Sequence, residues 1–207
     1  MSIELIIQAT EDLDWKQCEE SGMWVTTDGE HSVWLDSDNG GYYVEVSSDP
    51  DNTDMWLPHH DAVIHYIERF TEPFMIANMA ECEECGTLLH SKHRHDFVGC
   101  ECPQESRLYI DGGNDYVKVV GALHNRISKC VTSASQHSKI REVLYRGGYG
   151  KDGKQPYAET LMKDMSDDYL DNLIKYFEEV DEYKNKYYSM YLTEKMYRKW
   201  HNISIKG

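Results

Sequence analysis

The sequence predicts an α+β fold in three parts. Alternating apolar and polar segments joined by Asp-Gly and Asn-Gly predict an acidic antiparallel β-meander with one helix in residues 1–81. Four clustered cysteines predict a central zinc-ribbon-like β module in residues 82–121. Apolar residues at helical spacing predict a helical C-terminal part with a glycine-rich loop in residues 122–207. Hydrophobic residues make up 40% of the chain and aromatic residues 12%, which excludes a disordered protein.

The predicted meander begins near the N-terminus. Residues 4–9 favour a strand or a short apolar start, and residues 47–54 favour a loop because they are polar and contain Pro50. Asp28-Gly29 and Asn39-Gly40 are typical hairpin links, because these residue types tolerate the positive φ of a tight turn. The links join three alternating segments, at residues 22–28, 32–38 and 42–48.

A helix is predicted over residues 57–72, followed by a buried strand over residues 74–79 that leads to the cysteines. Pro58 suits the first turn of this helix, and Pro73 ends it because the residue before a proline avoids helical backbone angles. The apolar stripe of the helix consists of Val63, Ile64, Ile67 and Phe70.

The part of the chain after residue 121 is predicted to contain three helical segments. Residues 122–144 are expected to be mostly helical, and a final helix is expected over residues 184–200. Between them, Ser166 has the side chain of an N-cap and begins another helix. The apolar face of that helix consists of Leu170, Leu173, Ile174 and Phe177.

The charge of the chain is unevenly distributed. Residues 1–81 contain 18 acidic and two basic residues, so they hold the whole formal net charge of −16. Residues 82–207 contain 19 acidic and 19 basic residues. The negative region repels phosphates, which argues against direct nucleic-acid binding as the function. It either attracts a basic partner surface or only keeps the protein in solution.

The cysteines are arranged as Cys82-x2-Cys85-x14-Cys100-x-Cys102. In a reducing cytosol this spacing favours a metal site over disulfides, and four thiolates are a tetrahedral ligand set for structural Zn²⁺. Reduced buried thiols and a catalytic metal are the alternatives. Because the second spacer is short, one of three histidines could replace a thiolate; these are His90, His93 and His95.

A polar motif lies between the two cysteine pairs and contains His93, Arg94, His95 and Asp96. If this segment is a strand, His93 and His95 share one face. The motif then forms either an anion-binding or metal-binding edge, or a set of hydrogen-bonding groups that orient the zinc ligands.

Two glycine motifs follow. Asp111, Gly112 and Gly113 lie between strand candidates at residues 107–110 and 116–120, and they form either a simple hairpin turn or a place where a ligand or another backbone approaches closely.

The second glycine motif runs from Arg146 and includes Lys151 and Lys154. Its backbone N–H groups either form an anion-binding nest beside these cations or belong to a flexible loop. It lacks the Gly-Lys-Ser/Thr ending of a nucleotide P-loop.

The stretch CEECGTLLHSKHRHDFVGCECPQESRLYIDGGNDYVKVVG, residues 82–121, resembles a zinc-ribbon-like module in uncharacterised proteins of tailed bacteriophages. Three further stretches resemble a companion phage module: LYRGGYGKDGKQP at 144–156, LMKDMSDDYLDNLIKYFEE at 161–179 and MYRKWHNISI at 196–205. The resemblance implies a phage origin and zinc binding, without implying an activity.

We expect a cytoplasmic protein, in a bacterial host if its origin is a phage. The chain has no apolar run long enough for a transmembrane helix, and its N-terminus lacks the pattern of a signal peptide. The favoured function is a non-enzymatic binding protein that inhibits or sequesters a host protein or a small anionic defence signal such as a nucleotide. No catalytic residue is assigned.

Two other functions remain open. A metal-dependent hydrolase of nucleotides or phosphodiesters would use His93, His95 and Asp96 as metal ligands, with His124 and His137 as further candidates. An acidic DNA mimic would instead inhibit a DNA-handling enzyme.

Overall fold

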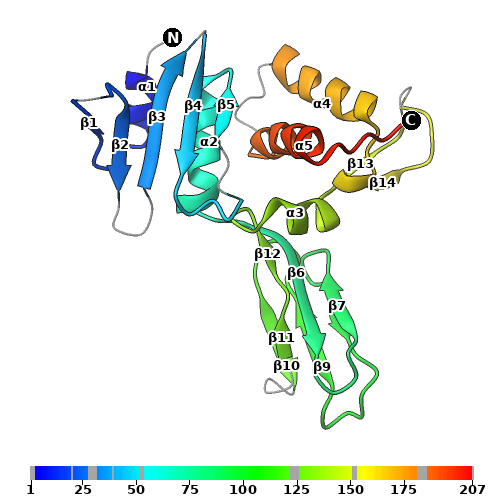
Figure 1. Ribbon diagram of the computed structural model, residues 1–207. Helices are drawn as coiled ribbons and strands as arrows, with labels where there is room; N and C mark the ends of the chain where they lie inside the picture. Colours follow the sequence, from blue (N-terminus) through cyan, green and yellow to red (C-terminus); the bar gives the residue numbers. More distant parts are fainter. Residues whose placement is uncertain are drawn as a thin grey trace. The chain divides into compact units, whose positions relative to one another are not determined.

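The computed structural model confirms the α+β class, with helices and antiparallel sheets (Figure 1). It divides into two compact units. The discontinuous unit comprises residues 1–73 and 134–207, and the inserted unit comprises residues 74–133. These boundaries differ from the predicted ones at 81/82 and 121/122. The structure describes residues 3–19, 21–27, 32–38, 40–51, 54–121, 126–150, 153–180 and 186–206, without the side chains of 27 and 38.

The discontinuous unit begins with a meander whose five strands are adjacent in chain order and antiparallel. Helices α1 and α2 lie on the same face of this sheet (Figure 1). Buried Val33, Leu35 and Val44 alternate with more exposed residues, as expected of strands with one covered face. The elements are α1 (Glu4–Ala9), β1 (Lys16–Gln17), β2 (Trp24–Thr27), β3 (Ser32–Asp38), β4 (Gly41–Val46), β5 (Met55–Leu57) and α2 (His60–Thr71).

The predictions for this region were mostly confirmed. The three alternating segments form β2, β3 and β4, and α2 lies within the predicted helix. Residues 4–9 form helix α1 rather than a strand, because a short apolar run has no periodicity that distinguishes the two. Strand β5 lies just after the predicted loop, with Met55 and Leu57 buried.

The second segment of the discontinuous unit is mainly helical. Ser166 caps α4, because its Oγ accepts a hydrogen bond of 3.2 Å from the Tyr169 N–H. None of the helices in the described ranges has the length and apolar character of a membrane span. The elements are α3 (His137–Val143), β13 (Tyr145–Gly148), β14 (Ala158–Leu161), the 3₁₀ helix η2 (Met162–Asp164), α4 (Asp167–Glu179) and α5 (Tyr188–His201).

A buried ionic network on α5 holds this segment together. Glu194 is fully buried, and its carboxylate accepts hydrogen bonds from Arg141 on α3 and from Arg198 one turn further along α5. His137 Nε2 lies 2.7 Å from the same carboxylate. The Arg198 guanidinium also donates to the carbonyl of Met165. The network therefore joins α3, α5 and the start of α4.

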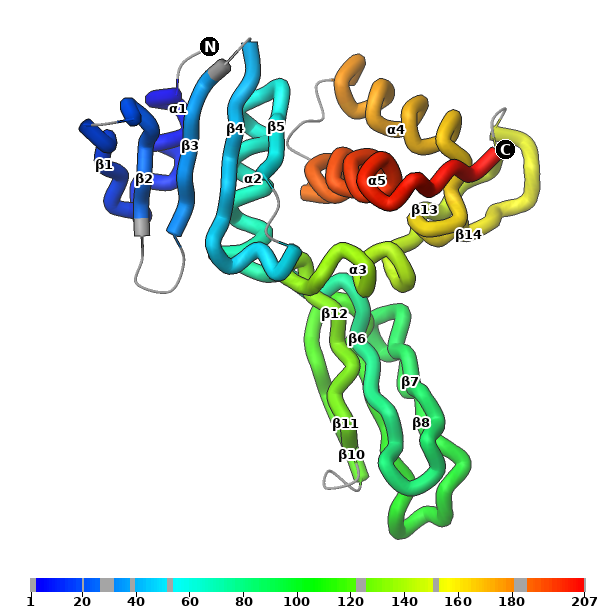
Figure 2. Tube along the Cα trace, viewed as in Figure 1, coloured from blue at the N-terminus to red at the C-terminus, as the bar shows by residue number. Residues whose placement is uncertain are grey.

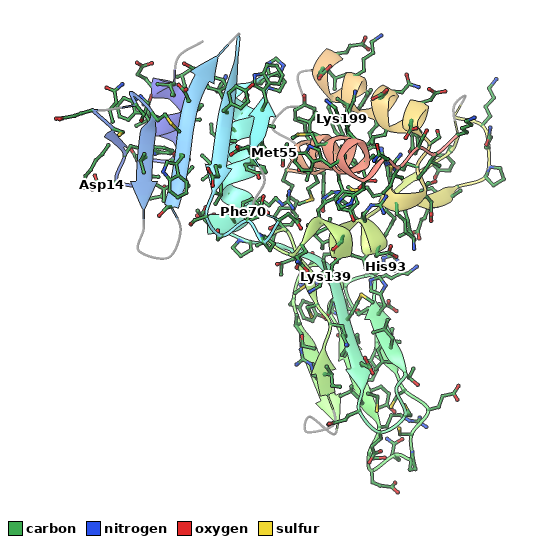
Figure 3. All side chains as sticks on the ribbon, in the orientation of Figure 1. Asp14, Met55, Phe70, His93, Lys139 and Lys199 are labelled. Carbon is green, nitrogen blue, oxygen red and sulfur yellow. The ribbon has the colours of Figure 1, made fainter. Side chains whose placement is uncertain are left out.

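The two chain segments of the discontinuous unit also contact each other. Asp51 accepts a hydrogen bond from the His137 N–H. Arg69, buried on α2, donates to Thr193 Oγ1 on α5 at 3.3 Å. Thr193 Oγ1 lies 4.0 Å from the sulfur of Met55, which is labelled in Figure 3. Residues 1–73 and 134–207 are therefore one packed body.

The inserted unit is built around strand β6, which pairs with β7, β11 and β12, and around β9, which pairs with β8 and β10. Figure 2 follows the chain through these strands. Leu89, Leu108 and Ile110 pack in its core with three of the cysteines. The elements are β6 (Met75–Cys82), β7 (Leu88–Ser91), β8 (Val98–Gly99), β9 (Leu108–Asp111), β10 (Lys118–Gly121), β11 (Arg126–Ser128) and β12 (Val131–Thr132).

One prediction for this region was wrong. Residues 122–144 were expected to be mostly helical, but β11 and β12 are strands and only α3 is a helix. Pairing with β6 decides their conformation, so a tertiary contact overrides the local sequence preference. Residues 122–125, including His124, lie outside the described residues.

The inserted unit begins and ends at one place. The Ser133 N–H donates to the Phe74 carbonyl at 2.9 Å, and the Phe74 N–H donates to Ser133 Oγ at 3.0 Å. Its first and last residues are thus joined by two hydrogen bonds.

Candidate metal centre

The four cysteines lie together in the inserted unit. The sulfur atoms of Cys82, Cys85, Cys100 and Cys102 are all within 4.8 Å of one another. Cys85 is exposed, and the other three are buried. Within the described ranges, this is the only cluster of three or more Cys, His, Asp or Glu side chains with the spacing of a metal site. None of the histidines considered as replacement ligands belongs to it.

The first cysteine pair is positioned by a tight turn at the end of β6. The Gly86 N–H donates to the Cys82 carbonyl at 2.7 Å, and the Cys82 N–H donates to the Thr87 carbonyl at 3.0 Å. Gly86 has φ +68°, in the left-handed region that favours glycine. The turn therefore returns the chain so that Cys85 reaches the sulfur of Cys82.

The second pair is positioned by β9. The Cys100 N–H donates to the Leu108 carbonyl at 3.0 Å, and the Leu108 N–H donates to Cys100 Sγ at 3.2 Å. Arg107 Nε donates to the Cys102 carbonyl at 2.9 Å. These bonds fix both cysteines, so the one-residue spacer still delivers two sulfur atoms to the cluster.

The cluster has the electrostatics of a cation site. Hydrogen bonds with the side chain and backbone of Thr87 lower the pKa of Cys85 to about 6. Burial raises the pKa of Cys100, but hydrogen bonds from the Leu108 and Cys102 backbone lower it more. The pKa of Cys102 is raised by its contact with Cys85 and by burial. Four adjacent thiols cannot all ionise without a cation, because like charges oppose the later ionisations.

The donor set fits a soft divalent ion. Four sulfur ligands in a closed cluster are typical of a structural zinc site, and they leave no position for a reacting water. The described residues could therefore hold a metal ion.

The motif between the cysteine pairs is a turn, so the strand interpretation of His93 and His95 was wrong. His95 has φ +66°, which interrupts any strand alternation. Asp96 stabilises the turn, because its carboxylate accepts from the Lys92 N–H at 2.8 Å and its N–H donates to the His93 carbonyl at 3.0 Å. His93, Arg94 and His95 are exposed.

The Asp111-Gly112-Gly113 turn packs against this motif. A Cβ at Gly113 would lie 2.6 Å from the His93 carbonyl carbon, and a Cβ at Gly112 would lie 1.9 Å from the Tyr116 carbonyl oxygen. The Gly113 N–H donates to Ser91 Oγ at 3.0 Å. Close approach of protein backbone therefore accounts for both glycines, and their role in ligand binding stays a prediction.

A hydrogen-bonded chain of side chains links the two turns. The Tyr116 hydroxyl donates to Asp111 Oδ2 at 3.0 Å and lies 3.2 Å from His95 Nδ1. Asn78 Nδ2 donates to the carbonyls of Asp111 and Tyr116. The sequence did not identify Asn78, because a polar residue within the apolar strand β6 reveals no partner from a distant segment.

The second glycine motif belongs to the discontinuous unit, where β13 and β14 form a hairpin. Arg146 is half-buried, and its guanidinium lies 5.5 Å from the centre of the Phe177 ring of the same unit. Lys154 is exposed, and Lys151 lies outside the described residues. His137 is buried beside Glu194. The anion-binding role of the motif stays a prediction.

No curated protein and no solved structure matches this chain. A family described as a domain of unknown function, DUF7695, matches residues 75–121. The matched segment contains β6 to β10, the four cysteines and both turns that pack against each other, so the chain carries a region similar to that domain.

Proposed function

We propose that the four cysteines bind one Zn²⁺ and that this ion stabilises the inserted unit. The closed set of four sulfur atoms supports this role, because a catalytic zinc keeps a coordination position for water or substrate. When bound, the ion would neutralise the thiolates and fix the turn after β6 to the turn before β9. Metal analysis of purified protein should find one zinc per chain.

The protein as a whole is proposed to be a phage-encoded, non-enzymatic binding protein that acts in the host cytoplasm by inhibiting or sequestering a host factor. The observation that carries this proposal is the charge of −16 confined to residues 1–81. Complementary charge accelerates association and selects partners, so the acidic segment suits a host protein with a basic surface. A DNA-handling enzyme is one such protein, and the chain would then act as a DNA mimic.

A small anionic signal is the second candidate ligand. It is supported by the exposed His93, Arg94 and His95, which the Asp96 hydrogen bonds hold on a defined turn. The Arg94 guanidinium and the imidazole N–H groups on this turn can donate hydrogen bonds to phosphate oxygens. A nucleotide is the ligand class that this chemistry suits.

Two assays distinguish these functions. Capture from bacterial lysate at low and at high salt tests for a basic protein partner, whose binding should weaken with salt. Isothermal titration with cyclic and linear nucleotides tests for the anionic signal. The binding proposal is wrong if neither assay detects a ligand. Phosphodiester hydrolysis that is sensitive to chelators and survives Cys82→Ser would instead favour the hydrolase.

A further inference from the structure

The meander sheet has one face that α1 and α2 do not cover (Figure 1). We call this the open face and define it by the residues that alternate with the buried ones on β2 to β5. Tyr43 is 47% exposed and Trp56 is 39% exposed. Large aromatic side chains at this exposure are typical of interaction surfaces when they gather on one face. The open face consists of Val25, Trp34, Asp36, Tyr43, Glu45 and Trp56.

The strand register places each carboxylate of the open face beside an aromatic ring. Trp34 on β3 is directly opposite Glu45 on β4, and Asp36 on β3 is directly opposite Tyr43 on β4. Tyr43 is in turn opposite Trp56 on β5. Directly opposed residues in antiparallel strands have Cβ atoms about 5 Å apart. The open face therefore combines aromatic surface and negative charge at the spacing of single side chains.

The position of Trp56 depends on Gly41. A Cβ at Gly41 would lie 2.5 Å from Cζ2 of the Trp56 ring, so the indole occupies the place that a side chain at position 41 would take. The ring is thus held against the backbone of β4. An aromatic surface fixed before binding loses less conformational entropy when a partner binds.

Positive charge is scarce in the chain segment that forms the open face. Residues 1–81 contain only Lys16 and Arg69 as basic residues, and Arg69 is buried. Lys16, on edge strand β1, forms a 3.0 Å ion pair with Asp14, which is labelled in Figure 3. Asp36 is exposed and Glu45 is half-buried, and residues 1–81 supply little positive charge to compensate these two carboxylates.

We infer that the open face is a docking surface for an arginine-rich or lysine-rich segment of a partner protein. A guanidinium or ammonium group is attracted to the face of an aromatic ring, and an adjacent carboxylate adds an ion pair. Nucleic acid is repelled by the same charges. A second copy of the chain carries the same net charge of −16 and is also repelled. This inference rests on the proposed function and specifies the chemistry of the protein partner.

The test uses the full-length protein and two synthetic peptides of equal length, one of alternating arginine and glycine and one of alternating glutamate and glycine. Isothermal titration and tryptophan fluorescence at low salt should show binding of the arginine peptide only. The double variant Tyr43→Ala/Trp56→Ala should lower the affinity by about tenfold, since it removes two exposed cation–π contacts that together contribute about 1.4 kcal/mol. Asp36→Asn and Glu45→Gln should each lower it by about threefold.

Matched controls remove the same groups elsewhere. Asp115→Asn removes one exposed carboxylate from the inserted unit, and Trp200→Ala removes an exposed indole from α5. Both should bind the arginine peptide as the unaltered protein does. Asp36→Asn and Glu45→Gln keep side-chain size, so they test the open face even if the double variant does not fold.

Three results would overturn the inference. If face variants and controls bind the arginine peptide equally, the docking surface is elsewhere, while the proposed binding function stands. If the unaltered protein does not bind that peptide, the open face has no affinity for cations. The proposed binding function is then tested independently by the lysate and nucleotide assays. If sedimentation shows self-association that Tyr43→Ala/Trp56→Ala abolishes, the occupant is a second copy.

Discussion

The Nε2 atom of His137 lies 2.7 Å from Oε2 of Glu194, and neither side chain is more than 1% exposed. Burial raises the pKa of Glu194, but hydrogen bonds with His137, Arg141 and Arg198 lower it more, to about 2. Burial lowers the pKa of His137. The Glu194 carboxylate raises it less than burial lowers it, and this carboxylate also binds two arginines. His137 Nδ1 has no hydrogen-bond partner in the described part of the chain, which fits a neutral ring.

This pair predicts a pH dependence of stability. His137 has a folded-state pKa below its ordinary value of 6.5, so the unfolded chain binds the proton more readily. The contribution of His137 to stability is complete above pH 6.5 and declines as the pH falls below that value. The contribution of the Glu194 carboxylate to stability is complete above pH 4.5 and declines as the pH falls towards 2.

The urea midpoint, followed by fluorescence, should therefore be lower at pH 5 than at pH 7. His137→Gln should reduce this difference. An unchanged midpoint between the two pH values in the unaltered protein would contradict a neutral buried His137.

Removal of the metal should destabilise the inserted unit. Chelation, or Cys100→Ser, leaves thiols without a cation, and the free energy of zinc binding is part of the folding free energy of small zinc modules. We expect loss of bound zinc and a thermal midpoint at least several degrees lower. Cys18→Ser is the control, because Cys18 belongs to the discontinuous unit. Equal melting curves with and without metal would show that zinc is not structural.

Gly113→Ala should destabilise the protein by about 3 kcal/mol. The new Cβ would meet the His93 backbone at 2.6 Å, and the φ of +54° adds strain of about 1 kcal/mol. Gly22→Ala is the matched control, since Gly22 has φ +75° with no atom within 4 Å of the added Cβ. Denaturant unfolding measures both. Equal losses in the two variants would mean that the packing of the two turns contributes nothing.

Tyr116→Phe should cost about 1–3 kcal/mol of stability, because it removes the hydroxyl that donates to the buried Asp111 carboxylate. The same substitution at Tyr149, which is 58% exposed, should change little. Urea unfolding measures the stability of both variants. If Tyr116→Phe and Tyr149→Phe are equally stable, the hydrogen bonds between Tyr116, Asp111 and His95 do not stabilise the protein.

The sequence predicted the features that depend on local chemistry. The Ser166 cap and the cysteine spacing both act within a few residues, whereas Asn39 of the predicted Asn39-Gly40 link lies outside the described residues. By contrast, β12 is a strand because Val131 pairs with Ala77, more than fifty residues away. The periodicity of a short segment does not indicate which distant strand it pairs with.

The same distinction applies to the candidate sites. The sequence singled out the motif of His93 and the turn of Gly113, and they proved to be neighbours. Their contact was not predictable from the sequence. Gly113 packs against the backbone of His93, and every residue has a backbone, so the residue types do not indicate the contact. The network around Glu194 was missed, since its two members on α3, His137 and Arg141, lie 57 and 53 positions before Glu194 in the chain.

The hydrogen bonds between Phe74 and Ser133 have an evolutionary consequence. A segment whose ends meet can be gained by a gene, or lost from it, without separating the flanking strands and helices. Residues 74–133 are therefore suited to act as an exchangeable cassette. The same cassette could be grafted into a surface loop of an unrelated scaffold, where it would carry its cysteine cluster with it.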